Sequence, residues 1–405
     1  MENLSAYTIL FIFCGLIILS YLFSVLHRAT RIPSVLLLLG TGILLRYISD
    51  TAGFQFVVPP ALIEMLGTVG LIMIVLEAGL DLEVTRKKLP LIRNSFFSAL
   101  VIFILSTVGV TGILLWRLPE APWISCMVYA IPLSIVSSAI VLPSVHHLGE
   151  EKKEFLIYEA SYSDVLGIMA FNFFTANQLI TWNDLTWFVG SVPVGIVLSV
   201  VVCFTLMLLL VKNQVNIKFF LVFAVLIVIY VGGKMMHLPS LLTILLFGLV
   251  INNWELFRWK PLHLYFSIES VEHVRGFLKS ITAESAFLIR TFFFIIFGYG
   301  IDLDFLENRE VLITGTAIVA ALLALRYVYL RIVHRYDLFP ELFYIPRGLV
   351  TVLLFYKIPH WQRIDQFDEG VLFFVILATS LIMMIGAILY RDRPKELEEI
   401  NRPPV

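Results

Sequence analysis

Charged residues are scarce in this sequence. Asp, Glu, Lys and Arg make up 15% of its 405 residues, whereas a soluble domain carries roughly 25%. Hydrophobic residues make up 59%, and the mean hydropathy is +0.92. The formal net charge is only −1, so the charge balance indicates neither acidic nor nucleic-acid partners. This composition excludes an ordinary soluble protein and predicts one that lies in a lipid bilayer.

Cysteine is also rare, and its three copies each lie inside an apolar run: Cys14, Cys126 and Cys203. They form neither a CxxC pair nor a paired loop set, which argues against a metal site or a disulfide framework. No HExxH motif occurs, and the adjacent His146 and His147 point apart on a helix. We therefore expect no metal, no cofactor and no enzymatic centre.

Long apolar runs dominate the chain instead. About thirteen segments reach the length that a spanning helix requires: 7–26, 32–48, 63–80, 95–116, 125–143, 155–173, 187–210, 217–235, 238–252, 281–300, 311–330, 342–357 and 370–390. The first is interpreted as a retained span, because no Lys or Arg precedes it as in a secretory signal. The sequence thus predicts an all-α polytopic membrane protein. Residues 253–280 are expected to form an amphipathic cytoplasmic linker, and 391–405 a short cytoplasmic tail.

Basic residues alternate between the predicted loops. Most of the 29 Lys and Arg residues lie after odd-numbered spans or in the tail, as Lys152 and Lys153 do. Loops after even-numbered spans hold Arg117, Lys234, Arg309, Lys357 and Arg363. Because basic residues gather on the cytoplasmic side, this pattern predicts an outside N-terminus and a cytoplasmic C-terminus. We expect the membrane to be a bacterial inner membrane.

A few charged residues nevertheless fall within or near the spans. They are the bases Arg46, Arg290, Arg326 and Arg347 and the acids Glu77, Glu159 and Asp164. Each such group at mid-bilayer costs about 2.5–3.5 kcal/mol on insertion scales. A protein that only had to reside in lipid would avoid this cost, so the charges indicate a transporter rather than a membrane enzyme or receptor. Arg290 could be functional or paired, and Glu77 and Asp81 are candidates for a gating role.

The sixth span carries the densest polar pattern, from Tyr158 to Asp164. Glu159 and Asp164 diverge by about 140° on a regular helix, so they cannot share one site. One can pair with a neighbouring helix while the other faces an aqueous path. Ser161 lies one turn before Asp164, and its hydroxyl could serve a small hard cation. The alternative is that both acids are merely paired with arginines.

Two spans combine helix-breaking and polar residues: Pro132, Ser134, Ser137, Ser138 and Pro143 in the fifth, and Pro346, Arg347 and Gly348 in the twelfth. Proline removes a backbone donor and clashes with the preceding turn. Interrupted spans of this kind supply carbonyls and helix ends as ligands in transporters, although serines also satisfy ordinary kinked helices. A packing kink does not explain Arg347. Arg326 in the eleventh span could snorkel to the cytoplasmic end.

Taken together, these motifs resemble the cation/proton antiporter superfamily, the sodium/proton exchangers and their relatives. The Glu-Ser-x-x-Asn-Asp of that family is matched at Glu159 and Asp164, with Ser163 in place of Asn. Its Gly-Pro-Arg-Gly is matched by residues 345–348, its basic residue in the eleventh span by Arg326, and its Gly-Leu-acid element by residues 79–81. The serines of the fifth span resemble the potassium-efflux branch.

The resemblance implies two inverted repeats of six helices, with the interrupted fifth and twelfth helices crossed beside Asp164. It also implies a core (about 95–173 and 311–390) that slides against a dimerisation scaffold in a homodimer, and a Glu159–Arg326 ion pair. The expected ion- and proton-binding residues are Asp164, Ser163, Ser161, Ser137 and Ser138, with Pro132, Pro346, Arg347 and Gly348 shaping the break.

The expected function is exchange of a monovalent cation for H⁺. Na⁺ is favoured and Li⁺ or K⁺ is possible. A single free carboxylate indicates electroneutral 1:1 competition. The alternative is a gated K⁺ efflux system with a separate cytoplasmic regulator.

Overall fold

The structure is a computed structural model that describes residues 6–30, 32–51, 60–85, 87–176, 186, 190, 193–202, 204–205, 218–235, 240–254, 268–301, 303–333 and 338–390. These residues contain helices and no strand. The α-helices are α1 (Ala6–Thr30), α2 (Ser34–Thr51), α3 (Pro60–Asp81), α4 (Leu89–Arg117), α5 (Trp123–Ser134), α6 (Ser138–Ser144), α7 (Glu150–Ala176), α9 (Lys218–Met235), α10 (Ser240–Asn252), α11 (Ile268–Gly300), α12 (Arg309–Val333), α13 (Leu349–Tyr356) and α14 (Gly370–Leu389). Three short 3-10 helices connect them: Leu303–Leu306, Glu341–Phe343 and His360–Gln362.

The predicted spans agree with these helices. Each of them except 187–210 coincides with one helix or with an interrupted one, and the split within 217–252 is confirmed by α9 and α10. Span 187–210 is described only in part, and the described part includes the short apolar helix Pro193–Val202. Six described helices are long and apolar enough to cross a membrane by length and composition, and others are shorter. The predicted all-α fold is therefore confirmed.

Prolines mark where several helices begin: Pro33 before α2, Pro60 in α3, Pro90 in α4 and Pro122 before α5. A proline costs little in the first turn, because the backbone N–H groups there have no partner within the helix.

The predicted linker 253–280 is wrong over its second half. Helix α11 already begins at Ile268 and runs for 33 residues. Val274 and Leu278, one turn apart, are both buried, so the amphipathic stretch packs as a helix and does not cross the surface as a loop. Residues 255–267 and the predicted tail 391–405 lie outside the described part.

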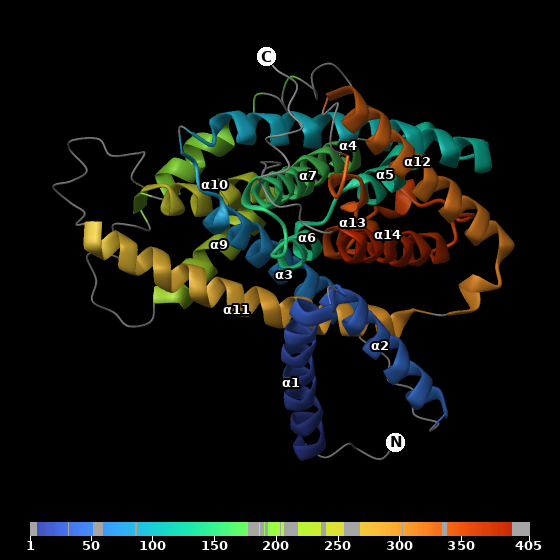
Figure 1. Ribbon diagram of the computed structural model, residues 1–405, viewed down its shortest axis with the longest axis horizontal. Coiled ribbons are helices and arrows are strands. Elements are labelled where there is room, and N and C mark those ends of the chain that lie inside the picture. Colours follow the sequence, from blue (N-terminus) through green and yellow to red (C-terminus); the bar gives the residue numbers. More distant parts are fainter. Residues whose placement is uncertain are drawn as a thin grey trace.

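The helices pack as two groups (Figure 1). In the first group, α4 contacts α5, α7 and α12, and α12 contacts α14. In the second, α11 packs along α2 and α3, and α3 packs along α10. Helix α13 contacts α5 of the first group and α3 of the second. Helix α1 lies at the edge against α2 and α11, with apolar side chains such as Tyr7 and Phe11 exposed.

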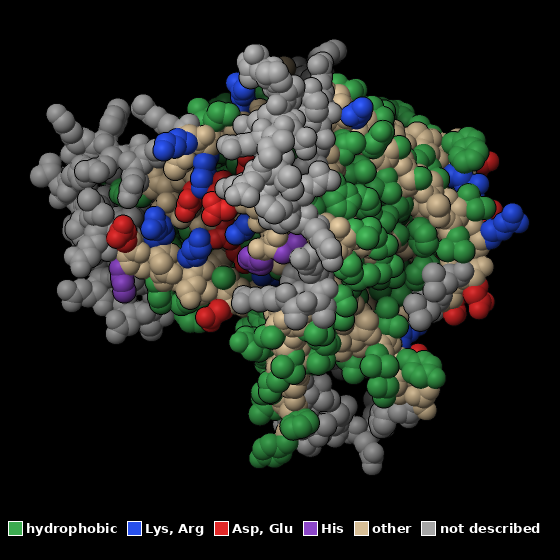
Figure 2. All heavy atoms as spheres, viewed as in Figure 1, with side chains coloured by type: hydrophobic (Ala, Val, Ile, Leu, Met, Phe, Trp, Pro, Cys, Tyr) green, Lys and Arg blue, Asp and Glu red, His purple; other side chains and the backbone are tan. Residues whose placement is uncertain are grey.

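Hydrophobic side chains cover most of the right half of the view in Figure 2. Lys, Arg, Asp and Glu side chains gather in its left half, toward the end at which α11 begins in Figure 1, and again along its right edge. Such a separation is expected of a chain whose apolar belt lies in hydrocarbon while its helix ends meet water.

Glycines permit a close helix crossing between α3 and α10 in the second group. A Cβ added at Gly79 of α3 would lie 2.5 Å from the carbonyl oxygen of Leu245 and 3.1 Å from Cα of Gly248, both in α10. These obstacles are backbone atoms that no rotamer change can remove. The glycine of the predicted Gly-Leu-acid element therefore has a packing role.

We predict that Gly79→Ala lowers the free energy of unfolding by about 1–3 kcal/mol, the usual range for overpacking. Thermal unfolding of the detergent-solubilised protein would measure the loss. Gly112→Ala in α4 is the matched control, because a Cβ there would meet nothing within 4 Å. Equal unfolding temperatures for the two variants would contradict the packing role of Gly79.

Candidate functional site

Both predicted helix interruptions are present, and they meet. Helix α5 ends at Ser134 and α6 begins at Ser138, with extended backbone at Ile135 and Ser137 between them. Residues 344–348 are likewise non-helical before α13 begins at Leu349. The backbone N–H of Ser137 donates to the carbonyl oxygen of Pro346 at 2.9 Å. The two interrupted segments therefore contact each other at their breaks, as the crossed arrangement predicts.

Asp164 of α7 lies against the first residue of α6. Its Oδ2 accepts hydrogen bonds from the backbone N–H of Ser138 at 3.0 Å and from the Ser138 hydroxyl at 2.5 Å. The residue is 2% exposed, and its Oδ1 is buried without a hydrogen-bond partner among the described residues. One oxygen of the carboxyl group is thus held in place while the other remains available.

The neighbouring serines divide between ligand positions and backbone support. Ser163 Oγ accepts the N–H of Val136 at 2.9 Å, a donor freed by the break between α5 and α6. The hydroxyl of Ser161 donates to the carbonyl oxygen of Ile157 on its own helix at 2.8 Å. Ser137 Oγ, by contrast, is buried without a hydrogen-bond partner in the described residues. Ser137 and Asp164 thus each present a buried oxygen that accepts no protein donor.

Glu159 and Arg326 form the buried ion pair that was predicted between α7 and α12. Arg326 Nη2 lies 2.6 Å from Glu159 Oε2, and Nη1 lies 3.3 Å from Oε1. Arg326 is 0% exposed, so it does not snorkel to a membrane surface. Its Nε donates to the carbonyl oxygen of Glu341, and the Ser98 hydroxyl donates to Glu159 Oε1. Every charged atom of this pair is therefore hydrogen-bonded, as a buried pair requires.

Arg347 is buried among backbone carbonyl groups. Its guanidinium donates to the carbonyl oxygens of Leu133, Ser134 and Ile345 at 2.8, 3.3 and 2.5 Å. Leu133 and Ser134 end α5, where the break leaves carbonyl groups without helical partners. Arg347 thus closes the broken end of α5 from the opposite interrupted segment. The arrangement explains why a packing kink alone did not account for this residue.

Proline and glycine shape the same crossing. Pro132 lies inside α5 two residues before its end, and Pro346 supplies the carbonyl oxygen that Ser137 contacts. A Cβ at Gly348 would lie 2.7 Å from Ser137 Oγ and 2.8 Å from Ile140 Cδ1. Glycine is therefore needed for the second interrupted segment to approach the first this closely.

The two gating candidates form ion pairs with α11. Arg290 donates to both carboxylate oxygens of Glu77, at 2.9 and 3.4 Å. Asp81 lies 2.8 Å from Lys279. Arg290, whose role was open between function and pairing, is thus paired. These contacts join α3 to α11 within the second helix group, and none of them reaches Asp164.

The connection between α3 and α4 carries a further polar cluster. Lys88 contacts Glu154 at 2.7 Å and Glu83 at 3.1 Å, and the Tyr158 hydroxyl donates to the carbonyl oxygen of Glu83 at 2.6 Å. The hydrogen bond to Glu154 raises the pKa of Lys88 above its usual range. Lys88 therefore remains an ammonium ion at every physiological pH.

Two site contacts have no counterpart in the sequence motifs. Ser98 supports Glu159 from α4, and Thr379 of α14 accepts the backbone N–H of Arg347 at 3.2 Å. A single hydroxyl residue in an apolar helix does not show which residue it will contact. The sequence therefore indicated only that polar residues lie in these spans. Within the described residues, no group of three or more His, Cys, Asp or Glu could hold a metal. His147 instead lies 3.5 Å from the Tyr344 hydroxyl.

Comparisons with known proteins agree with the fold. The family model of the sodium/hydrogen exchanger transmembrane domain matches residues 9–390. A structure of the sodium proton antiporter MjNhaP1 from Methanocaldococcus jannaschii at pH 8 superposes with a TM-score of 0.66 at 16% identity, covering 94% of each chain. A second structure of MjNhaP1, from electron microscopy, gives 0.67 at 17% identity, covering 95% of this chain and 96% of that one. A comparison with curated proteins finds no match.

We predict that Glu159→Ala destabilises the protein by about 3–5 kcal/mol, because it leaves the buried Arg326 charge without its carboxylate. The double variant Glu159→Leu/Arg326→Met should recover most of that loss, since it removes both charges. Unfolding temperatures of the two variants and the native protein would measure this. A single variant as stable as the native protein would contradict the energetic role of the pair.

Proposed function

The chain belongs to the sodium/hydrogen exchanger family, and we propose that it exchanges Na⁺, or with lower preference Li⁺ or K⁺, for H⁺ by competition at Asp164. The observation that carries this proposal is the state of that carboxyl group. It is buried, one oxygen is fixed by Ser138, and the other has no hydrogen-bond partner among the described residues. A proton or a cation can complete the free oxygen, but not both at once.

Burial supplies the competition. An ionised carboxylate in an apolar environment is costly unless a positive partner neutralises it. Either a proton or a monovalent cation meets that need, and each gives Asp164 the same net charge. The bare carboxylate is the costly form, so the helices that carry it should move through the membrane only when it is loaded. Coupled exchange follows because each crossing then carries one of the two ligands.

A stoichiometry of one cation for one proton follows from the two buried acids of α7, Glu159 and Asp164. Glu159 is occupied by Arg326 and Ser98, which leaves Asp164 as the acid of this helix that is free to exchange ligands. Arg347 keeps its charge in both loaded forms, because its donors are bound to carbonyl groups. The two loaded forms therefore carry equal charge, and the exchange is electroneutral.

The oxygen atoms near the breaks are suitable for a hard cation. Sodium and lithium ions prefer oxygen ligands, as other hard cations do. We assign Asp164 Oδ1 and the Ser137 hydroxyl to the bound ion, because both oxygens are buried and without a partner in the described residues. Ser138 holds the second carboxylate oxygen, Ser163 supports the broken backbone, and Ser161 offers its lone pairs from the preceding turn.

The moving part is proposed to be the predicted core (about 95–173 and 311–390), which contains Asp164 and the first helix group. The remaining helices would form the scaffold of a homodimer. This division is supported by the packing of α4, α5, α7, α12 and α14 on one another and of α2, α3, α10 and α11 on one another. The protein is an integral membrane protein, and we propose a bacterial inner membrane with the C-terminus in the cytoplasm.

Gated K⁺ efflux with a separate cytoplasmic regulator is the second candidate. The serines at the break favour it, because Ser137 and Ser138 both lie at the crossing. The two functions differ in what drives cation movement. An efflux channel moves cations without moving protons, whereas an exchanger moves one proton in the opposite direction for each cation.

We predict that Asp164→Asn abolishes cation-driven collapse of a pH gradient in proteoliposomes. The amide has nearly the same size as the carboxyl group. It carries no negative charge, so it cannot bind a proton or a monovalent cation as the carboxylate does. Native protein should exchange Na⁺, with Li⁺ and K⁺ tested beside it, and its rate should not respond to membrane voltage. Helical content and unfolding temperature should remain near native values, which would separate loss of exchange from loss of folding.

Ser161→Ala is the matched control on the same helix face, because its hydroxyl is hydrogen-bonded to Ile157. It should retain exchange with a modest change in apparent cation affinity. Retained exchange in Asp164→Asn would refute the assignment of that residue. Cation flux with no opposite movement of protons would favour gated efflux.

A further inference from the structure

Four helices have an end at one face of the molecule, called here the Lys357 face. Helix α3 begins at Pro60, α11 ends at Gly300, α13 ends at Tyr356 and α14 begins at Gly370. Lys357 follows α13 at this face. At the opposite face α3 ends at Asp81 and α7 begins at Glu150. Asp164 lies between the two faces, so any ion that reaches it from the Lys357 face must pass these helix ends.

Helices α3 and α13 are closely packed along this half of the molecule. Gly67 and Gly70 of α3 face Leu353 and Leu349 of α13. A Cβ at Gly67 would overlap the Leu353 side chain, and a Cβ at Gly70 would lie 3.6 Å from Leu349 Cδ1. Both leucines are buried. We name this contact the α3–α13 seam, formed by Gly67, Thr68 and Gly70 with Leu349, Leu353 and Lys357.

Lys357 joins the seam by polar contacts. Its ammonium group donates to Thr68 Oγ1 of α3 at 3.1 Å and to the Tyr230 hydroxyl of α9 at 3.4 Å. The same nitrogen lies 5.9 Å from the centroid of the Tyr230 ring, within the range of a cation–π contact. One charged group thus links the end of α13 to two helices outside the first group. The link is made where α13 leaves the apolar seam.

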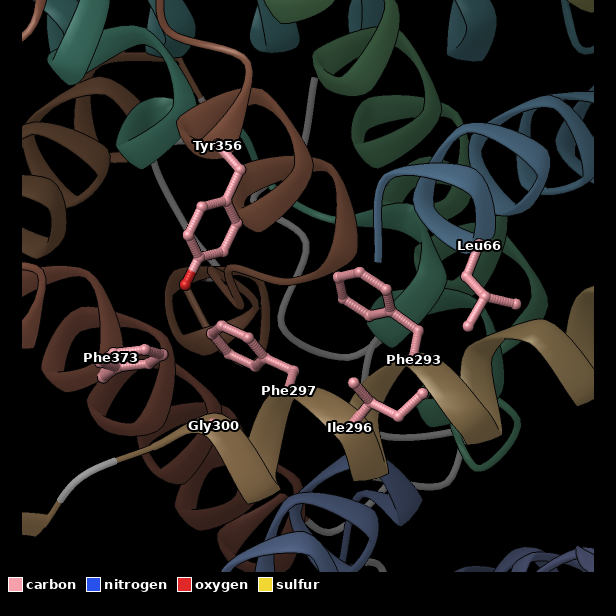
Figure 3. Close-up of a pocket in the computed structure, with 7 residues that line it drawn as sticks. All are labelled: Leu66, Phe293, Ile296, Phe297, Gly300, Tyr356 and Phe373. Atoms are coloured by element: carbon pink, nitrogen blue, oxygen red, sulfur yellow. The ribbon is translucent and has the colours of Figure 1, made fainter. Parts of the chain in front are cut away.

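The space beside the seam is small and apolar (Figure 3). A cavity of about 40 Å³ lies between α3, α11, α13 and α14, with Phe293, Phe297, Phe373 and Tyr356 in its wall. Phe293, Phe297 and Phe373 are buried, and the Tyr356 hydroxyl is the polar side-chain atom that the wall contains. A cation that gives up its hydration water needs several oxygen ligands from the protein, and such a wall supplies too few of them. The cavity therefore offers no route around the seam.

We propose that the α3–α13 seam closes access to Asp164 from the Lys357 face, and that Lys357 is the positioning residue that locks it. The leucines exclude water, and the ammonium group holds α13 against α3 and α9. The seam must separate for an ion to enter from this face, which breaks the contacts to Thr68 and Tyr230. Lys357 thus sets how often the site opens to this face without touching the transported ion.

This proposal rests on the exchange function proposed above, so its first test does not use transport. Cys14, Cys126 and Cys203 are replaced by Ala, and Leu353→Cys places one thiol in the seam. A membrane-impermeant maleimide then reports how often the seam opens to water. Hydrogen bonds to charged groups contribute enough that Lys357→Met should raise the alkylation rate roughly tenfold. Tyr230→Phe, which removes one acceptor and keeps the ring, should raise it less.

Lys234→Met is the matched control. Lys234 lies on α9 one turn after Tyr230 and is exposed, so its loss removes the same charge near this face without removing the seam contacts. Its alkylation rate should equal that of the Leu353→Cys protein with Lys357 intact. An unchanged rate in Lys357→Met, or an equal rise in Lys234→Met, would overturn the proposal.

Transport supplies the second readout, in right-side-out and everted membrane vesicles. Apparent affinity scales with the fraction of protein whose site is open to the ion. Lys357→Met should therefore lower the cation KM several-fold at the Lys357 face and not at the opposite face. A general loss of structure would move both faces together, and a KM that changes equally at both would overturn the proposal. Native protein that exchanges no cation would refute the exchange function. The alkylation rates would still show whether Lys357 holds the α3–α13 seam closed.

Discussion

The hydrogen bond between Ser137 N and Pro346 O is the contact on which the rest of the site depends. Broken helices are tolerated inside a membrane only where protein satisfies the freed backbone groups. Here two breaks satisfy each other, and side chains complete what the backbone cannot. Ser163 accepts the N–H of Val136, and Arg347 donates to the last carbonyl groups of α5. The polar environment around Asp164 is therefore a consequence of closing two interrupted helices.

Helix α7 places two acids in opposite electrostatic situations. Glu159 has a guanidinium partner and a hydroxyl donor, so its charge is permanently balanced. Asp164 receives two hydrogen bonds from a single serine, and its other oxygen has no hydrogen-bond partner in the described part of the chain. The separation of about 140° between them on the helix allows both arrangements at once. Two buried acids with different partners can therefore share a helix within two turns of each other.

The sequence was informative where a residue type is costly in a membrane. Charged residues in spans led to Asp164 and Arg347, the family resemblance led to the Glu159–Arg326 pair, and proline and glycine led to both breaks. It was less informative about partners, because hydroxyl residues such as Ser98 and Thr379 are common in helices and carry no direction. It was wrong at 268–280, where charged residues suggested a loop but Val274 and Leu278 continue a helix. Local composition does not show whether a polar stretch outside the bilayer keeps its helical hydrogen bonds.

The length of α11 has a mechanical consequence. Its 33 residues extend about 50 Å, whereas the hydrocarbon layer is about 30 Å thick. Roughly two fifths of its length therefore exceeds the thickness of the apolar layer. A continuous helix has no joint, so a push on its projecting end tilts the part that carries Arg290 and packs on α2 and α3. Helix α11 in that sense acts as a lever. A change in bilayer thickness, or a protein bound to its projecting end, would tilt the part of α11 that packs inside the molecule.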